Sequence, residues 1–142
     1  MIDLNLKQAF FASQRIAQYW QMEGRGGKIV NVASVLSFQG GIRVASYTAS
    51  KSGLAGLTRL LACEWAGKGI CVNAIAPGYI VTNNTQALRD DPERREAILA
   101  RIPAGRWGQP SDIGEAAVFL CASASDYVHG AVLPVDGGWL AR

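Results

Sequence analysis

Two short apolar stretches, set far apart in the chain, constrain its fold more than any other feature. They are KIVNVAS, residues 28–34, and ICVNAIA, residues 70–76. Both are rich in β-branched residues and bounded by glycine, which predicts short strands buried on both faces. Leucines at helical spacing follow residue 47, so a long helix separates the two strands. A strand, a long helix and a second strand predict a right-handed crossover between parallel strands.

The rest of the chain continues this alternation. Residues 4–22 and 47–66 predict two long helices from their apolar periodicity. Residues 92–102 predict a shorter helix, Ser111 is the expected cap of a last one, and AVLPVDGG, residues 131–138, predicts a final strand. A doubly wound sheet normally has about six strands or more. The expected fold of residues 1–142 is therefore α/β: a single, partial domain, the C-terminal half of a doubly wound parallel-sheet (Rossmann-type) domain that lacks the N-terminal nucleotide-binding half.

Composition argues against several kinds of partner. The net charge is +3, and no cluster of lysine and arginine is interleaved with aromatic residues, so we expect no nucleic acid. No apolar run approaches the roughly 18 residues of a membrane span, and the first residues lack the order of a signal peptide, so we expect no membrane and a cytoplasmic location. The three cysteines lack CxxC spacing and there is one histidine, so we expect no metal site.

The stretch SYTASKSG, residues 46–53, places Tyr47 four residues before Lys51 at the start of a predicted helix. On a helix the two side chains share a face, so the ammonium can approach the phenol. A phenol has a pKa of about 10, and a lysine in a poorly solvated cleft would lower it towards neutrality. Taken alone, however, this spacing arises often enough by chance that two ordinary residues on a solvated face are the stronger interpretation.

Other polar residues favour the catalytic interpretation. Ser34 ends the first predicted strand, and Pro77 with Gly78 ends the second, at the sheet edge where parallel folds bind ligands. Asn5 interrupts the apolar face of the first helix, where an amide needs hydrogen-bond partners. Together with Tyr47 and Lys51, these residues predict a catalytic cluster.

With these residues, the sequence resembles the short-chain dehydrogenase/reductase family. The resemblance runs through DLNLKQAFF, IVNVAS, YTASK, NAIAPGYIVT and PVDGG, along essentially the whole chain. It implies hydride transfer between a nicotinamide cofactor and a carbonyl or alcohol. It also implies that Tyr47 is the general acid/base and that Ser34 orients the reacting oxygen. Lys51 would lower the tyrosine pKa and bind the nicotinamide ribose, and Asn5 would hold a water in a proton relay.

The resemblance further implies a set of cofactor contacts: Tyr47, Lys51, Pro77, Gly78, Ile80 and Thr82. The family's glycine-rich TGxxxGxG turn, the residue that chooses NAD or NADP, and the NNAG strand have no counterpart in this sequence. The stretch GRGGK, residues 24–28, is no substitute, because it leads into a strand rather than opening a helix. We expect NAD as the cofactor, with NADP as an alternative.

Longer runs, such as SFQGGIRVASYTASKSG and APGYIVTNNTQALR, resemble a branch of the family that acts on sugar acids in pectin and uronate breakdown. Arg43 and Arg106 are candidates to bind the substrate carboxylate, although a solvated arginine is the stronger interpretation for each. Asn83 and Asn84 either bind sugar hydroxyls or shape a turn. A 3-oxoacyl or steroid reductase of the same family is an alternative.

The resemblance also implies a homo-oligomer, usually a tetramer, which pairs helices 4–22 and 47–66 between subunits. The apolar excess on both helices fits this interface. The same surfaces support a hypothesis from a different class: an inactive truncated remnant, or interaction module, that associates with full-length subunits.

Overall fold

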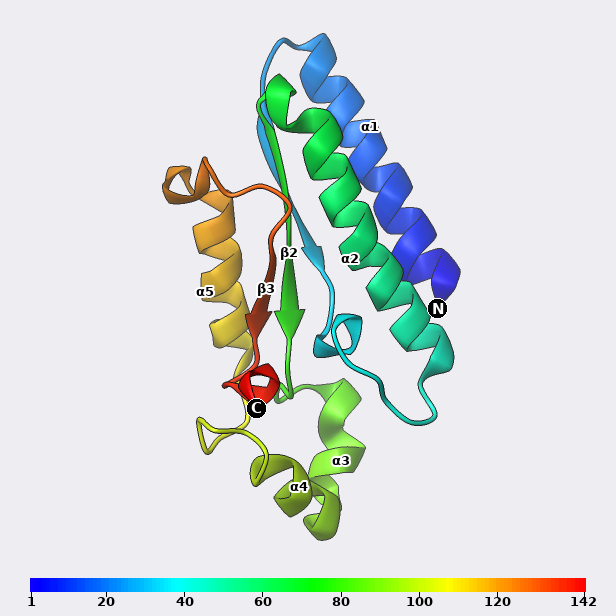
Figure 1. Ribbon diagram of the computed structural model, residues 1–142, viewed down its shortest axis with the longest axis vertical. Helices are drawn as coiled ribbons and strands as arrows, with labels where there is room; N and C mark the ends of the chain where they lie inside the picture. The colour runs from blue at the N-terminus through cyan, green and yellow to red at the C-terminus, as the bar shows by residue number, and fades with distance from the viewer.

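The computed structural model describes residues 1–142 and confirms the α/β fold, with three parallel strands in the order β1-β2-β3 (Figure 1). The strands are β1 Gly27–Val32, β2 Ile70–Pro77 and β3 Val132–Val135. The α-helices are α1 Gln8–Met22, α2 Ala45–Trp65, α3 Gln86–Asp90, α4 Pro92–Leu99 and α5 Pro110–Cys121. As parallel pairing requires, α2 connects β1 to β2, and the segment from α3 to α5 connects β2 to β3.

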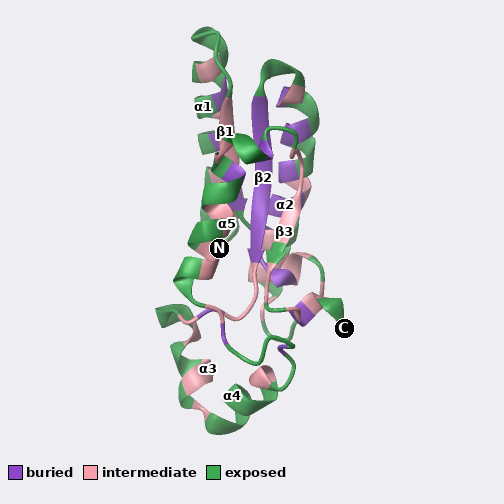
Figure 2. Ribbon diagram, turned by 90° about the vertical axis from the view of Figure 1, so that its left-hand side faces the viewer, coloured by how far each residue is buried: buried purple, intermediate pink, exposed green.

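The central strand, β2, is buried at every position from Ile70 to Ala76. Helices α1 and α2 cover one face of the sheet and α5 covers the other (Figure 1). Buried residues therefore concentrate along β2 and on the helix sides that face it (Figure 2). Because the three strands are parallel, their carboxyl ends meet at one edge of the sheet, next to α3, α4 and the C-terminus.

The main apolar core lies between the two long helices and the sheet. Ala17 of α1 packs with Leu61 and Trp65 of α2 over Ile70 and Val72 of β2. Burial of large apolar side chains contributes about 1.5–3 kcal/mol each, so this cluster is the main source of the fold's stability.

The opposite faces of these helices carry apolar groups in contact with solvent. The exposed fractions are 52% for Phe11 of α1, 52% for Leu60 of α2 and 50% for Val32 at the end of β1. Strand β1 pairs only with β2, which leaves its other edge free. Apolar side chains and one strand edge are therefore accessible to other molecules. None of the helices is long and apolar enough to cross a membrane.

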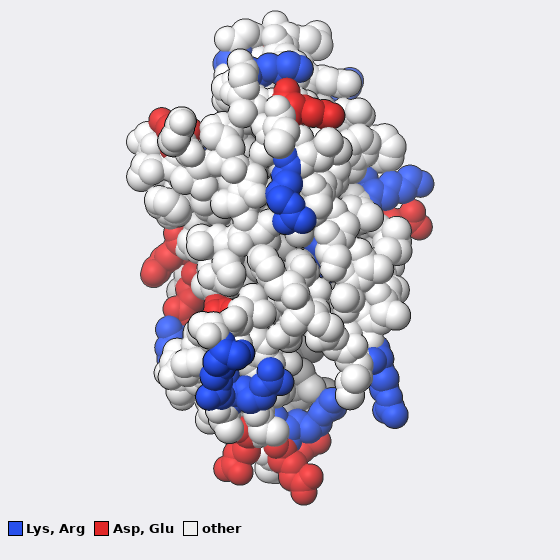
Figure 3. All heavy atoms as spheres, viewed as in Figure 1, with Lys and Arg blue, Asp and Glu red and all other residues white.

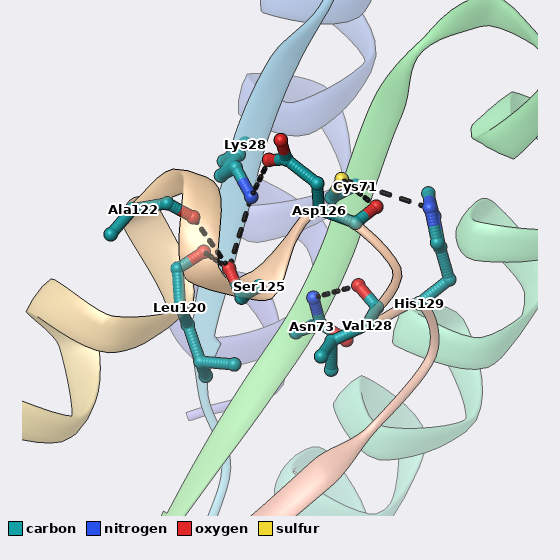
Figure 4. A network of polar contacts seen from close by, with 9 residues as sticks. All are labelled: Lys28, Cys71, Asn73, Leu120, Ala122, Ser125, Asp126, Val128 and His129. Atoms are coloured by element: carbon teal, nitrogen blue, oxygen red, sulfur yellow. Dashed lines mark hydrogen bonds and ion pairs between the residues drawn. The ribbon is translucent and has the colours of Figure 1, made fainter.

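At the amino edge of the sheet, a network of polar contacts ties the strands to the loop after α5 (Figure 4). The Lys28 ammonium of β1 pairs with the Asp126 carboxylate at 2.8 Å and donates to the Ser125 hydroxyl at 3.0 Å. The Asn73 amide of β2 is buried, and both its ends bond to the backbone of residues 128–131. These contacts therefore tie β1 and β2 to the segment that leads into β3.

The start of α5 differs from the sequence expectation. The cap is Gln109 rather than Ser111, and Pro110 takes the first helical position. A proline there already has the helical φ value, so the helix begins before Ser111. The Asp112 carboxylate accepts a hydrogen bond from the Gln109 backbone N–H at 2.6 Å. The expected cap at Ser111 is therefore wrong, and Asp112 lies in the first turn, where a carboxylate favours the positive end of the helix.

Candidate active site

Ser34 follows the carboxyl end of β1. It is 6% exposed and its backbone is extended. Its hydroxyl oxygen accepts a hydrogen bond from the Leu36 N–H at 3.2 Å, so Ser34 caps the turn Val35–Ser37. A hydroxyl has one proton to donate and two acceptor positions. The bond to Leu36 uses one acceptor position and leaves the proton available to a substrate oxygen.

Tyr47 and Lys51 lie one turn apart near the start of α2, and contacts with the end of β1 hold this turn in place. The Lys51 ammonium lies 5.7 Å from the centre of the Tyr47 ring and donates to the Val32 carbonyl at 2.5 Å. The Ser37 hydroxyl donates to the Lys51 carbonyl at 2.8 Å. The tyrosine–lysine pair is therefore tied to the same strand end that positions Ser34.

Burial lowers the pKa of Lys51. Partial removal of water disfavours the charged ammonium, so a counter-charge close to it becomes favourable. Perturbed lysines of this kind cluster at functional sites. A phenolate at Tyr47 would be such a counter-charge.

Asn5 reaches this group from the first helix. It lies in the π-helical stretch Asp3–Lys7, and such wide turns occur often at functional sites. The Asn5 amide donates to the Ser50 hydroxyl at 3.2 Å, and Ser50 donates to the Tyr47 carbonyl at 2.7 Å. Ser50 is not among the predicted site residues. Its signal is a small polar residue three positions after Tyr47, on the buried face of α2.

The predicted cofactor contacts follow the carboxyl end of β2. Pro77 closes the strand, and Gly78 is a close approach, because a Cβ there would lie 2.7 Å from the Asp136 Cα. Ile80 is buried and bridges to Gly108, and Thr82 caps the next turn. These residues lie at the carboxyl edge of the sheet, where β2 is next to β1.

The predicted substrate contacts are less closely grouped. Arg43, Asn83 and Asn84 are exposed, and Arg43 has a φ of 59°, which is unusual for a residue with a side chain. Figure 3 shows basic side chains at the end of the molecule that holds α4 and the C-terminus, with acidic ones beside them. This region therefore offers individual cations rather than a uniformly positive surface.

Arg106 already has a charge partner. Its guanidinium bonds to both oxygens of the Asp112 carboxylate, at 2.8 and 3.0 Å. This pairing raises the pKa of Arg106 and lowers the pKa of Asp112 to about 2. The two side chains line a cavity of about 130 Å³ with Tyr79 and Asp136. Arg106 therefore forms an ion pair with Asp112, and of the two candidate cations only Arg43 has no charge partner within the chain.

The residues present fit one part of a nicotinamide cofactor. A partly desolvated ammonium and a tyrosine, beside half-buried Pro77 and Gly78 at the end of β2, are suited to a ribose and a nicotinamide ring. The glycines at residues 24–27 lie between α1 and β1, and Gly27 begins the strand. No helix starts there whose N–H groups could hold a phosphate. The residues at the carboxyl edge are therefore suited to the nicotinamide end of the cofactor, and residues 24–28 do not form a phosphate-binding turn.

Comparison with known proteins identifies the family. A short-chain dehydrogenase model described as enoyl-(acyl carrier protein) reductase matches residues 1–140. The chain belongs to the short-chain dehydrogenase/reductase family. It is 63% identical over all 142 residues to 2-dehydro-3-deoxy-D-gluconate 5-dehydrogenase of Dickeya dadantii and covers 56% of that protein. The chain thus spans little more than half the length of the curated relatives it matches.

Solved structures of this family superpose closely on the chain. One from Agrobacterium tumefaciens, provisionally described as a 2-deoxy-D-gluconate 3-dehydrogenase with bound NADP, is 68% identical with a TM-score of 0.98, and the match covers 99% of this chain and 57% of that one. A gluconate 5-dehydrogenase from Burkholderia cenocepacia in complex with NADP and tartrate is 39% identical with a TM-score of 0.95, covering 99% and 55%. The three-stranded sheet and its helices are therefore the fold of about half of a Rossmann-type short-chain dehydrogenase.

Proposed function

We propose that this chain carries the catalytic half of an oxidoreductase that transfers a hydride between a nicotinamide cofactor and a hydroxyl or keto group of a sugar acid. The substrate would be 2-deoxy-D-gluconate, 2-dehydro-3-deoxy-D-gluconate or a close relative. The observation that carries the proposal is the Tyr47–Lys51 pair, which is held against the end of β1 beside Ser34. The names of the relatives at 63% and 68% identity support the substrate class.

In the oxidation direction, the substrate hydroxyl would lie between the Ser34 and Tyr47 side chains. The Ser34 O–H donates to the reacting oxygen and fixes its position. Tyr47, as phenolate, takes the hydroxyl proton as the carbonyl forms. Lys51 stabilises that phenolate by its charge. The bound nicotinamide supplies the acceptor for the hydride that leaves carbon.

Asn5 and Ser50 act on the reacting atoms indirectly, through Tyr47. Their hydrogen bonds fix the first turn of α2 at the Tyr47 carbonyl, which limits movement of the phenol. We propose that Pro77, Gly78, Ile80 and Thr82 contact the nicotinamide side of the cofactor. Both NAD and NADP are candidates for the cofactor. The two solved relatives described above hold NADP.

For the substrate carboxylate, Arg43 is the candidate that the geometry favours, because Arg106 is paired with Asp112. A relative that holds tartrate, a hydroxy acid, supports an anionic substrate of this size. Asn83 and Asn84 are exposed on the turn Asn83–Thr85, where they could bind hydroxyl groups.

The direct test is an assay of the purified 142-residue chain for NAD(P)-dependent oxidation of 2-deoxy-D-gluconate, with a 3-oxoacyl thioester and a 3-ketosteroid as competing substrates for reduction. Turnover of the sugar acid that Tyr47→Phe abolishes would support the proposal. Turnover of the acyl or steroid substrate alone would replace it with the reductase alternative.

A second function is favoured by the exposed apolar faces of α1 and α2. These faces suit association with other subunits, as in a tetramer that pairs helices 4–22 and 47–66, and such association does not require turnover. Sedimentation of the chain alone, and mixed with a full-length relative, distinguishes the two functions. A chain that associates equally well as wild type and Tyr47→Phe, with no turnover in either form, would be an interaction module.

A further inference from the structure

A small apolar cluster at the carboxyl edge joins segments that follow all three strands. Val35 follows β1, Tyr79 follows β2 and Trp139 follows β3. Val35, Ile102 and Trp139 are buried together, and Tyr79 packs against them. None of these residues belongs to the main core under α1 and α2. The cluster therefore positions the segments beyond the strand ends rather than the strands themselves.

Trp139 is held firmly within this cluster and is 3% exposed. The turn that presents it needs glycine at Gly137 and Gly138, whose φ values are 64° and 88°. The Asp136 carboxylate accepts hydrogen bonds from the Gly138 and Leu140 N–H groups at 2.9 and 3.0 Å. These bonds fix the backbone on both sides of Trp139.

The indole ring touches segments from two other parts of the chain. The Arg101 guanidinium carbon lies 4.0 Å from the ring centre, a favourable cation–π contact from the segment that follows α4. The Tyr79 ring lies 4.7 Å away, centre to centre. Trp139 thus connects the segment after α4 with the residues that follow β2.

A hydrogen bond extends this connection to the loop of residues 38–44, which follows the Ser34 turn and leads into the Tyr47 helix. The Trp139 indole N–H donates to the Gln39 side-chain oxygen at 3.0 Å. No other hydrogen bond joins this loop to a distant segment, since the Gln39 N–H bonds locally to the Val35 carbonyl. The loop is otherwise open, and Ile42 at its tip is 85% exposed.

We propose that Trp139 is a positioning residue: through its hydrogen bond to Gln39 it holds the loop of residues 38–44, which carries Arg43 and joins the Ser34 turn to the Tyr47 helix. The effect on substrate rests on the function proposed above, whereas the effect on the loop does not. Loss of the bond would loosen the substrate side of the site and leave the nicotinamide side, built on residues after β2, in place.

The test compares Gln39→Met, which removes the acceptor at similar length, with Gln39→Glu, which keeps an acceptor oxygen, and with Trp139→Phe. Amide hydrogen exchange over residues 38–44 and the ¹⁵N indole resonance of Trp139 are measured in the 142-residue chain. A neutral hydrogen bond corresponds to roughly a five- to tenfold change in equilibrium. We expect exchange to accelerate by about that factor in Gln39→Met and to stay near wild type in Gln39→Glu.

Two further variants separate positioning from general destabilisation. The double variant Gln39→Met/Trp139→Phe should exchange in the loop no faster than Trp139→Phe alone, because the bond can be lost once. Trp20→Phe, the same change in the main core beside Gly27, is the matched control and should leave loop exchange unchanged. In the turnover assay, Gln39→Met should raise KM for the sugar acid about five- to tenfold and leave KM for the nicotinamide unchanged.

Each outcome has a separate meaning. Loop exchange or an indole resonance unaffected by Gln39→Met would overturn the proposal, as would additive effects in the double variant. If exchange responds but both KM values rise together, the loop is positioned without substrate selectivity, and the substrate part of the proposal is overturned. If the wild-type chain shows no turnover while exchange responds as expected, the proposed function fails and the positioning role stands.

Discussion

The two edges of the sheet use similar polar residues in opposite ways. At the amino edge, Lys28 and Asn73 direct their side chains to partners within the chain, and their hydrogen-bonding groups are engaged. At the carboxyl edge, Ser34 keeps its proton free and the Tyr47 phenol has no hydrogen-bond partner in the chain. Satisfied groups stabilise a fold, whereas groups left available next to a desolvated cation are suited to chemistry. Changes at the two edges should therefore separate stability from activity.

The largest expected effect is that of Tyr47→Phe. General acid/base catalysis contributes roughly 10²–10⁴ to the rate, so turnover should fall by about 10³-fold. The lost hydroxyl has no partner in the chain, so the free energy of unfolding should change by no more than about 0.5 kcal/mol. Steady-state kinetics and urea unfolding on the same sample check both statements. Turnover within tenfold of wild type would remove Tyr47 from the mechanism.

The second largest effect should be that of Lys51→Met. Turnover should fall by about 10²-fold, as it does when one group that stabilises developing charge is removed. Stability should change little, because the fold disfavours the Lys51 cation. The pKa of Lys51 is lower in the folded chain than in the unfolded one, so between these pKa values the unfolded chain binds more protons and stability rises with pH.

The rise in stability occurs at pH values below the unfolded lysine pKa of about 10.4. Lys51→Met should reduce this dependence of stability on pH. The free energy of unfolding, measured by urea titration from pH 7 to 10, reports the slope. An equal slope in both proteins would mean that Lys51 is not desolvated, with Lys68→Met as a control on an exposed lysine.

Asn73→Ala tests the other edge. It removes a buried amide that bonds to the backbone of residues 128–131 and leaves those groups without partners, which costs about 2–3 kcal/mol. Turnover of the folded fraction should be unchanged. Urea unfolding gives the stability, and kinetics below the unfolding transition give the activity. A kcat that falls while stability holds would reverse the assignment of the two edges.

The smallest effect should come from Asp112→Asn at the exposed ion pair with Arg106. The pKa of Asp112 is lowered to about 2, so its stabilising contribution is complete above the unfolded value of about 3.9 and is lost as the pH falls from 4 towards 2. The variant should unfold in acid with a shallower pH dependence over that window. Carboxyl ¹³C NMR of the wild type checks the pKa itself, and a value near 4 would contradict the pairing.

Periodicity and buried strands were enough to predict the architecture. Residues 28–32 of the first predicted strand lie in β1, the stretch at 70–76 lies in β2, and both long helices are present. The ends of helices are harder to predict from sequence. Helix α5, for example, begins at Pro110, before the expected cap Ser111. Local competition between capping residues is not visible in an apolar pattern.

For the site, the sequence indicated the residue types but not their partners. The bond from Lys51 to the Val32 carbonyl joins a helix to a strand end nineteen residues away, and no local spacing predicts it. The pairing of Arg106 with Asp112 depends on how the chain turns into α5. Trp139 was assigned no role, because its contact with Gln39 spans 100 residues of sequence.

The most direct test of the contrast between the two edges is a titration of NADH into the purified chain, followed by nicotinamide fluorescence, with Lys51→Met and Asn73→Ala alongside. We predict saturable binding to the wild type, weaker binding to Lys51→Met, and unchanged binding to the folded fraction of Asn73→Ala. A folded wild-type sample that does not bind NADH, or one whose binding Lys51→Met leaves intact, would contradict the assignment of the nicotinamide site to the carboxyl edge of this chain.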